Sequence, residues 1–326
     1  MAVGSGSKLK NRPYQNPVYP HYFADPFVFR HESLFYAVGT SPECGNGDPN
    51  VFPMLASEDL VEWERLNNAL VPPDGMADGT FWAPEIAEHD GRFYMYYSVG
   101  QDDKDHHLRV AVSEKPGGPY RDQARLSDPA LSFAIDGHPY RHTDGEWYLF
   151  YAVDLLDGER SGTSIVADRL IDMTRLAGET IVVARATRDW QRYESNRAIY
   201  GGRYDWHTLE GPFVVTRQGK IYCLYSGGNW QNETYGVDYV VADHPLGPYC
   251  NTAGEAPRLL KTKPNLVLGP GHNSVVRTMD DQAEMVVYHA WDPAMTARTM
   301  RIDPLVWTDE GPRCHGPSIT PQPAFG

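Results

Sequence analysis

One short pattern recurs five times along this 326-residue chain, and it constrains the fold more than any other feature of the sequence. Each copy is a turn followed by alternating aromatic and aliphatic residues, which is typical of a β-strand entered from a tight turn. The copies occupy residues 32–40, 91–98, 145–152, 219–226 and 282–290. A repeat of roughly 55–75 residues indicates one supersecondary unit used five times.

A second strand-like segment follows each copy, and segments with helical periodicity are nearly absent. The loops at residues 116–120 and 245–249 share the sequence motif Pro-x-Gly-Pro-Tyr. These features predict an all-β chain folded as a five-bladed β-propeller with four strands in each blade. We expect a single domain over residues 13–326, preceded by a flexible leader at residues 1–12. Separate β-sandwiches are the structural alternative, but they would not explain the shared loop motif.

Ionisable residues stand upstream of the aromatic strand in all five repeats. They are Asp25, Glu85, Asp136, Glu210 and His272. The innermost strands of a propeller face one axis, so equivalent points near their starts converge on a single pocket. Crowded carboxyl groups in a partly desolvated pocket acquire raised pKa values, and glycosidic cleavage needs one protonated and one ionised carboxyl. The pattern therefore favours a glycoside hydrolase.

Each motif also has a structural explanation. An isolated Asp-Pro usually starts a turn, and Glu-Gly-Pro by itself is usually a loop. The motifs stand at nearly the same place in successive repeats, and this shared position favours a catalytic role for Asp25, Asp136 and Glu210. Glu85 would look the same if it were a buried acid paired with an arginine or a backbone N–H.

Composition narrows the class of partner. Lys and Arg number 29 against 43 Asp and Glu, which gives a formal net charge of −14 and argues against nucleic acid or anionic lipid. The four cysteines, Cys44, Cys223, Cys250 and Cys314, show no metal-ligand spacing. The first residues contain no apolar signal segment and no run is long enough to span a membrane, so we expect a cytoplasmic protein.

The same residues carry a resemblance to a known family. The motifs Ala24-Asp25-Pro26, Trp82-Ala83-Pro84, Ile135-Asp136, Glu210-Gly211-Pro212 and the stretch 269–273, in this order, resemble glycoside hydrolase family 43. The segments 288–291 and 298–303 resemble it too. The match covers nearly the whole chain, from about residue 16 to about residue 312. It implies an inverting hydrolase that acts on pentose-containing plant polysaccharides or their oligosaccharides.

The resemblance assigns roles residue by residue. Asp25 matches the general base that activates the attacking water, and Glu210 matches the general acid that protonates the leaving oxygen. Asp136 matches the third acid, which orients Glu210 and tunes its pKa. Two carboxyl groups in opposite protonation states, with a third setting the difference, suit this division.

The resemblance also implies substrate and metal contacts. Arg298 resembles the arginine that hydrogen-bonds the terminal sugar, although Arg301 could take that role instead. Trp82 could stack on a sugar face or pack between blades, and Glu85 is a further candidate for substrate binding. His272 resembles a histidine that helps to hold a hydrated divalent cation, commonly calcium. Because calcium prefers oxygen ligands, a satisfied polar residue in the pocket wall is the alternative for His272. No organic cofactor is expected.

Several substrates remain open. We favour a β-1,4-xylosidase that releases terminal pentose residues from xylo-oligosaccharides, with an α-L-arabinofuranosidase or exo-arabinanase as the alternative. The expected partner is a small oligosaccharide, and a homo-oligomer is an open alternative. A sucrose- or fructan-cleaving hydrolase is disfavoured because the corresponding stretches here are Ala-Asp-Pro-Phe and Glu-Gly-Pro. A non-catalytic sugar-binding propeller is a further alternative, but it would be expected to lack one of the three acids, and all are present.

Overall fold

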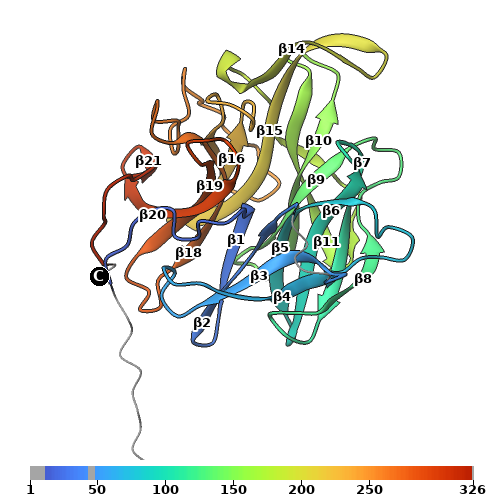
Figure 1. Ribbon diagram of the computed structural model, residues 1–326. Coiled ribbons are helices and arrows are strands. Elements are labelled where there is room, and N and C mark those ends of the chain that lie inside the picture. The colour runs from blue at the N-terminus through green and yellow to red at the C-terminus, as the bar shows by residue number, and fades with distance from the viewer. Residues whose placement is uncertain (1–11, 43–47, 325–326) are drawn as a thin grey trace, which may run out of the picture.

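The computed structural model describes residues 12–42 and 48–324, and in these ranges the chain is almost entirely β-structure (Figure 1). The one helical element among them is the short 3-10 turn Asp189–Gln191. The predicted leader and Cys44 lie outside the described residues, apart from Arg12. None of the described helices is long and apolar enough to cross a membrane.

The strands form five consecutive antiparallel units. In each unit the first strand pairs with the second and the second with the third. The first strands are β1 (Ala24–His31), β5 (Thr80–His89), β9 (Ala134–Arg141), β15 (Gly202–Arg217) and β18 (Leu268–Arg277). The second strands are β2 (Leu34–Thr40), β6 (Arg92–Gln101), β10 (Trp147–Leu155), β16 (Lys220–Gly227) and β19 (Glu284–Trp291).

The third strands are β3 (Val51–Ser57), β7 (Lys104–Ser113), β11 (Gly162–Asp172), β17 (Gly236–Ala242) and β20 (Arg298–Thr308). The remaining outer strands are β4 (Glu64–Val71), β8 (Tyr120–Arg125), β12 (Arg175–Leu176), β13 (Ile181–Ala184), β14 (Arg192–Ile199) and β21 (Gly311–Cys314). The five predicted aromatic segments are the five second strands. Alternating aromatic and aliphatic side chains suit this place because both faces of these strands are largely covered.

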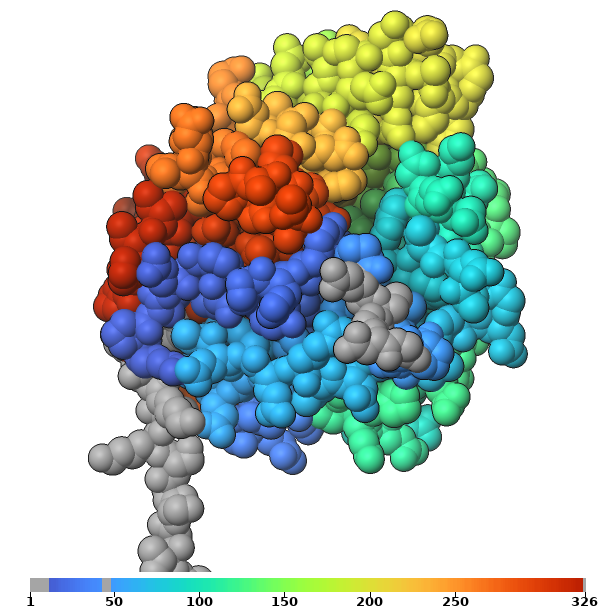
Figure 2. All heavy atoms as spheres, in the orientation of Figure 1, coloured from blue at the N-terminus to red at the C-terminus, as the bar shows by residue number. Residues whose placement is uncertain are grey.

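The first strands follow one another around a closed circle. Contacts join β1 to β5, β5 to β9, β9 to β15, β15 to β18, and β18 back to β1. Figure 2 shows the N-terminal and C-terminal parts of the chain side by side on one face. The circle therefore brings together residues that lie far apart in the sequence.

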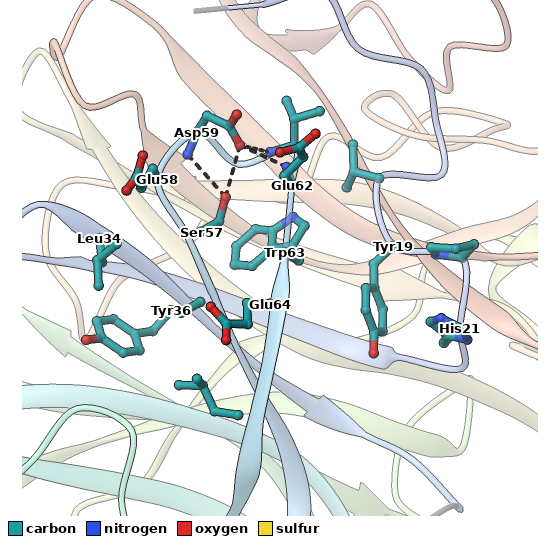
Figure 3. Close-up of a pocket in the computed structure, with 15 residues that line it drawn as sticks. Tyr19, His21, Leu34, Tyr36, Ser57, Glu58, Asp59, Glu62, Trp63 and Glu64 are labelled. Atoms are coloured by element: carbon teal, nitrogen blue, oxygen red, sulfur yellow. Dashed lines mark hydrogen bonds between the residues drawn. The ribbon is translucent and has the colours of Figure 1, made fainter. Parts of the chain in front are cut away.

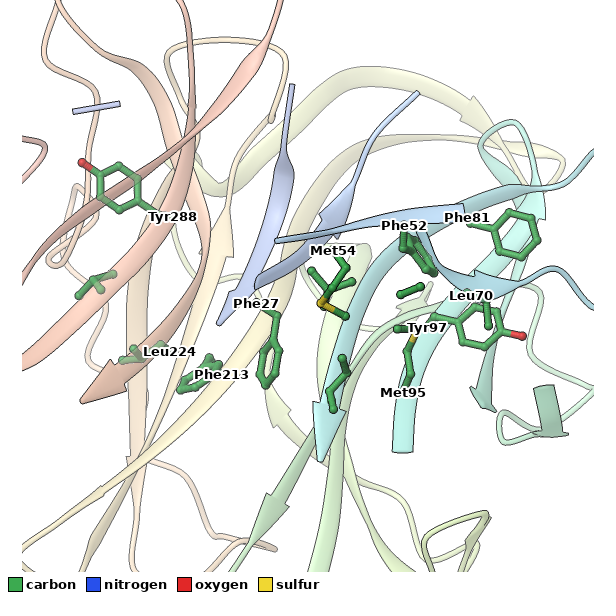
Figure 4. Close-up of a cluster of buried hydrophobic side chains, with 14 of the residues drawn as sticks. Phe27, Phe52, Met54, Leu70, Phe81, Met95, Tyr97, Phe213, Leu224 and Tyr288 are labelled. Carbon is green, nitrogen blue, oxygen red and sulfur yellow. The ribbon is translucent and has the colours of Figure 1, made fainter. Parts of the chain in front are cut away.

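The units share a core. One buried cluster contains Phe27 and Met54 from the first unit, Met95 from the second, Phe213 from the fourth and Tyr288 from the fifth (Figure 4). Separate β-sandwiches would each have a hydrophobic core of their own, which differs from this core shared by several units.

The two loops that share the Pro-x-Gly-Pro-Tyr motif fold in the same way. Gly118 and Gly247 both have positive φ, at 85° and 76°, where glycine is favoured over other residues. The Tyr120 hydroxyl donates to the Pro116 carbonyl at 2.8 Å, and the Tyr249 hydroxyl donates to the Pro245 carbonyl at 2.9 Å. The repeated motif thus specifies a repeated turn.

Candidate active site

All five first strands carry a β-bulge at the same point. At this point three steps along the first strand face two steps along the second, so one residue is extra, and β18 has a second shift of the same kind between Leu268 and Gly271. The extra residue has positive φ in every case. These five residues are Asp25 (51°), Ala83 (47°), Asp136 (60°), Gly211 (56°) and His272 (48°). Because Asp and His tolerate the left-handed region better than most side chains, three of the five bulges can present an ionisable group.

The bulge refines the predicted equivalence of the acids. Asp25, Asp136 and His272 occupy the bulge itself, whereas Glu210 precedes the bulge residue Gly211 and Glu85 stands two residues after Ala83. All of these side chains are buried or nearly so. The charges of Asp25 and Glu210 both act on Asp136, which brings the three predicted catalytic carboxyl groups into one electrostatic cluster.

Asp25 is surrounded by nitrogen. Its Oδ1 lies 3.4 Å from Arg298 Nη1 and 3.3 Å from Nδ1 of both His272 and His289. Burial opposes ionisation, but His272, Arg298 and His289 together hold the pKa of Asp25 well below the ordinary carboxyl value. Burial lowers the pKa of His272, and it lowers that of His289 to about 4. Arg298 is therefore the permanent cation that keeps Asp25 ionised at neutral pH.

Glu210 has the opposite surroundings. Burial raises its pKa to about 7, and the Asp25 charge adds to the rise. The Tyr235 hydroxyl donates to Glu210 Oε1 at 2.7 Å and offsets part of this rise in pKa. One carboxyl that stays ionised and one that holds a proton near neutral pH can serve as a base and an acid.

Asp136 lies between these two environments. Its Oδ2 accepts the Gly211 N–H at 2.8 Å, so it is bound to the residue next to Glu210. Burial, and then the charges of Glu210 and Asp25, raise its pKa, whereas the Gly211 N–H favours its ionised form. Asp136 and Glu210 interact strongly enough to titrate as a pair.

Glu85 has a histidine as its partner. Its Oε2 accepts from His138 Nδ1 at 2.6 Å, and His138 Nε2 accepts the Val214 N–H at 3.0 Å. The His138 ring also packs against Phe213, with centroids 4.4 Å apart. The Glu85 charge also acts on Asp136, while its own hydrogen-bond partner is His138, and the substrate contact of Glu85 stays a prediction.

Arg298 and Trp82 both contact aromatic or imidazole rings. Tyr22 Oη accepts from Arg298 Nε and Nη2 at 3.2 and 3.0 Å, and the Trp230 ring lies 4.5 Å from the guanidinium carbon. The half-buried Trp82 stacks on His106 with ring centroids 3.5 Å apart, so His106 covers one face of the indole.

Arg301, the sequence-based alternative to Arg298, has a different environment. It pairs across the sheet with Tyr288, and its titratable neighbours are the Tyr288 phenol and the Asp303 carboxyl. This position favours Arg298 as the arginine of the acid cluster.

Sequence reasoning missed Tyr235, Tyr22, Trp230 and His289. Tyr235 and Trp230 stand outside the repeated segments, and Tyr22 precedes the first one, so no repeat singles them out. His289 could have been found, because it stands near the end of the fifth aromatic segment, in the register position that Ser98 and Ser226 occupy in theirs.

An open hollow of about 820 Å³ lies on the outer strands of the first unit, away from these residues (Figure 3). Tyr19, Tyr36, Trp63 and Glu64 contribute to its wall. At its turn, Asp59 Oδ1 accepts from the Ser57 hydroxyl. None of the predicted site residues lines this hollow.

A metal at His272 finds few protein ligands. Within residues 12–42 and 48–324, no group of three or more His, Cys, Asp or Glu side chains is arranged to hold a metal ion. His272 Nδ1 faces Asp25 Oδ1, which Arg298 also approaches. This set does not match the oxygen-rich shell of calcium.

Comparison with known proteins identifies the family of this chain. The family model "Glycosyl hydrolases family 43" matches residues 14–312. A β-D-galactofuranosidase of Aspergillus niger is 27% identical over 88% of this chain and 79% of its own length. An extracellular exo-α-(1→5)-L-arabinofuranosidase of Streptomyces chartreusis is 23% identical over 85% of this chain and 82% of its own.

A solved structure agrees as well. The crystal structure of a thermostable family-43 glycoside hydrolase superposes with a TM-score of 0.82 at 32% identity, covering 95% of this chain and 98% of the other. The matched family model spans the strands that carry Asp25, Asp136 and Glu210. The chain therefore belongs to glycosyl hydrolase family 43.

Proposed function

We propose that this glycoside hydrolase is an inverting, exo-acting enzyme that removes terminal pentose residues from oligosaccharides. The observation that carries the proposal is the cluster of Asp25, Asp136 and Glu210, in which burial and neighbouring charges separate the ionisation of the acids. Asp25 takes a proton from water as the water oxygen bonds to the anomeric carbon. Glu210 gives its proton to the glycosidic oxygen as the bond from that oxygen to the anomeric carbon breaks.

We further propose that the five units are the blades of one β-propeller and that residues 13–326 form one domain. The cyclic contacts of the first strands and the core shared between units support this architecture. So do five bulges at matching places, since a ring of equal units would bring them to one axis.

The substrate is proposed from the relatives. The two compared relatives are named for furanosides, and an α-L-arabinofuranosyl ring has the same ring configuration as a β-D-galactofuranosyl ring. This favours a terminal α-L-arabinofuranoside, while β-1,4-xylosidase activity stays the prediction from the sequence. Rates on aryl α-L-arabinofuranoside, aryl β-D-xyloside and aryl β-D-galactofuranoside would decide among them. Measurable sugar binding without turnover of any aryl glycoside or pentose oligomer would instead favour the non-catalytic propeller.

The catalytic roles can be tested by two variants. Asp25→Asn should lower kcat by about 10²–10⁴-fold on substrates with good and poor leaving groups alike, because both need an activated water. Glu210→Gln should cause a loss of that size only with poor leaving groups, because activated aryl groups depart without protonation. Equal losses for Glu210→Gln on both substrates would contradict the acid role. The configuration of the first-formed sugar, followed by NMR, tests inversion.

A divalent cation near His272 stays a proposal, with calcium as the first ion to test. Since the nearby protein ligands are few, water would have to supply most of the coordination shell. Unchanged rate and melting temperature after chelator treatment would remove the ion from the account. Cytoplasmic location and homo-oligomer formation likewise stay predictions from the sequence.

A further inference from the structure

A hydrogen bond joins neighbouring units at each bulge. In four of the five junctions, the backbone N–H of the bulge residue donates to a side chain on the second strand of the preceding unit. These bonds run from Ala83 to Thr40 Oγ1 (2.8 Å), from Asp136 to Ser98 Oγ (3.3 Å), from His272 to Ser226 Oγ (2.7 Å) and from Asp25 to His289 Nδ1 (3.0 Å). We call these four side chains the junction acceptors.

Strand register identifies the fifth member of this set. Each junction acceptor stands opposite the residue that precedes the bulge in its own unit, as Thr40 stands opposite Ala24 and Ser226 opposite Glu210. In the third unit the residue opposite Ile135 is Ala152. A methyl group cannot accept a hydrogen bond, so this junction has no acceptor on its second strand.

The Gly211 N–H finds its partner elsewhere. It donates to Asp136 Oδ2 at 2.8 Å, and both residues are buried. A buried N–H left without a partner is costly, so an acceptor at this point is needed. The third unit therefore lacks a junction acceptor. The same unit carries Asp136, whose carboxylate binds the strand of Glu210.

We infer that Ala152 is a positioning residue, which by offering no acceptor leaves the Gly211 N–H to the Asp136 carboxylate. An N–H donor favours the ionised form of its acceptor. Asp136 and Glu210 repel each other when both are charged, so a donor that favours the charge on Asp136 also favours the proton on Glu210. This role rests on the proposed function, in which Glu210 is the proton donor.

The variant that tests the inference is Ala152→Ser, because serine is the acceptor at two of the other junctions. Its hydroxyl should accept the Gly211 N–H, and Asp136 should then take up the shared proton more readily. We expect the pKa of Glu210, measured by ¹³C NMR of its labelled carboxyl, to fall by about one unit. The basic limb of the pH–rate profile for a poor leaving group should move down equally, with about a tenfold loss of rate at pH 8.

Two control variants separate positioning from folding. Ala152→Gly also offers no acceptor and should leave the pKa of Glu210 in place. Thr40→Val removes a junction acceptor at a bulge without an ionisable group, so it should lower the melting temperature and leave the basic limb unmoved. A folded Ala152→Ser enzyme with an unchanged Glu210 pKa would overturn the inference.

A measurement on the unaltered enzyme covers the case in which Ala152→Ser does not fold. The amide proton shift of Gly211 should follow the titration of the Asp136 and Glu210 pair, because its acceptor changes charge. A Gly211 amide that does not respond while the pair titrates would contradict the inference. Neither NMR measurement needs turnover, so an enzyme inactive on every glycoside would overturn the proposed function and leave this test intact.

Discussion

At the scale of single residues, the two proposed catalytic carboxyl groups differ in their neighbours. Asp25 faces the Arg298 guanidinium, and Glu210 faces a phenol hydroxyl and the Asp25 charge. Because Glu210 must be protonated to act, the rate on a poor leaving group should fall as pH rises above about 7. Asp25 stays ionised through the acidic range, so it should add no acidic limb above pH 4. A rate that instead increases from pH 6 to pH 8 would contradict the assignment.

Tyr235→Phe tests the hydrogen bond to Glu210. The Tyr235 hydroxyl stabilises the ionised form of Glu210, so its removal should raise the pKa of Glu210 and move the basic limb up by about one unit. The pH–rate profile with a poor leaving group measures the shift. Tyr225→Phe is the matched control, since the Tyr225 hydroxyl is also buried but accepts from Gln191 Nε2 instead. Equal shifts in both variants would show that the effect is not specific to Glu210.

At the scale of elements, the repeated turns offer a paired prediction. Tyr120→Phe and Tyr249→Phe each remove one hydroxyl that closes an equivalent loop. Each should lower the free energy of unfolding by about 1 kcal/mol, because a single hydrogen bond to a backbone carbonyl is lost. Urea denaturation of the two variants measures this. A loss in only one of them would show that the two turns are not energetically equivalent.

The elements also show what the sequence could predict. Alternation of aromatic and aliphatic residues identified all five second strands, because that pattern depends on burial of both strand faces. The bulges were not predicted, since an extra residue in one strand is visible only against the register of its partner. A hint existed for Glu85: it precedes its tyrosine Tyr94 by 9 residues (94 − 85), whereas Asp136 precedes Tyr148 by 12 (148 − 136). The shorter spacing corresponds to its place two residues after the bulge residue Ala83.

Partners that come from other units were beyond prediction. Asp25 and Arg298 are 273 positions apart, and their contact depends on closure of the circle. The role of Ala152 was equally hidden, because an alanine in an apolar strand carries no signal by itself.

At the scale of the whole molecule, burial of Glu210 reduces stability as pH rises. Glu210 has a folded-state pKa raised from 4.5 to about 7, so its contribution to stability is present at low pH and is lost as pH rises through about 7. Glu210→Gln cannot ionise and should therefore melt at a higher temperature than the unaltered enzyme at pH 8, with the difference shrinking toward pH 5. Calorimetric scans at the two pH values measure this. An equal difference at both would exclude ionisation of Glu210 as the cause.

Closure of the circle depends on the first described residues. Asn16 Nδ2 donates to the Ile302 carbonyl at 2.7 Å, and Asn16 Oδ1 accepts the Ile302 N–H at 2.9 Å. Tyr14, Val18 and Tyr19 pack in one buried cluster with Met300 and Ile302.

This closure has a consequence for biosynthesis. The partners of Asn16 are translated 286 positions later, which at ordinary elongation rates means a delay of roughly 15–60 s. During that interval the nascent chain exposes apolar residues whose covering strand has not yet left the ribosome. Chaperone binding to the growing polypeptide should therefore persist until the last unit emerges, and ribosome release should come shortly before the native state.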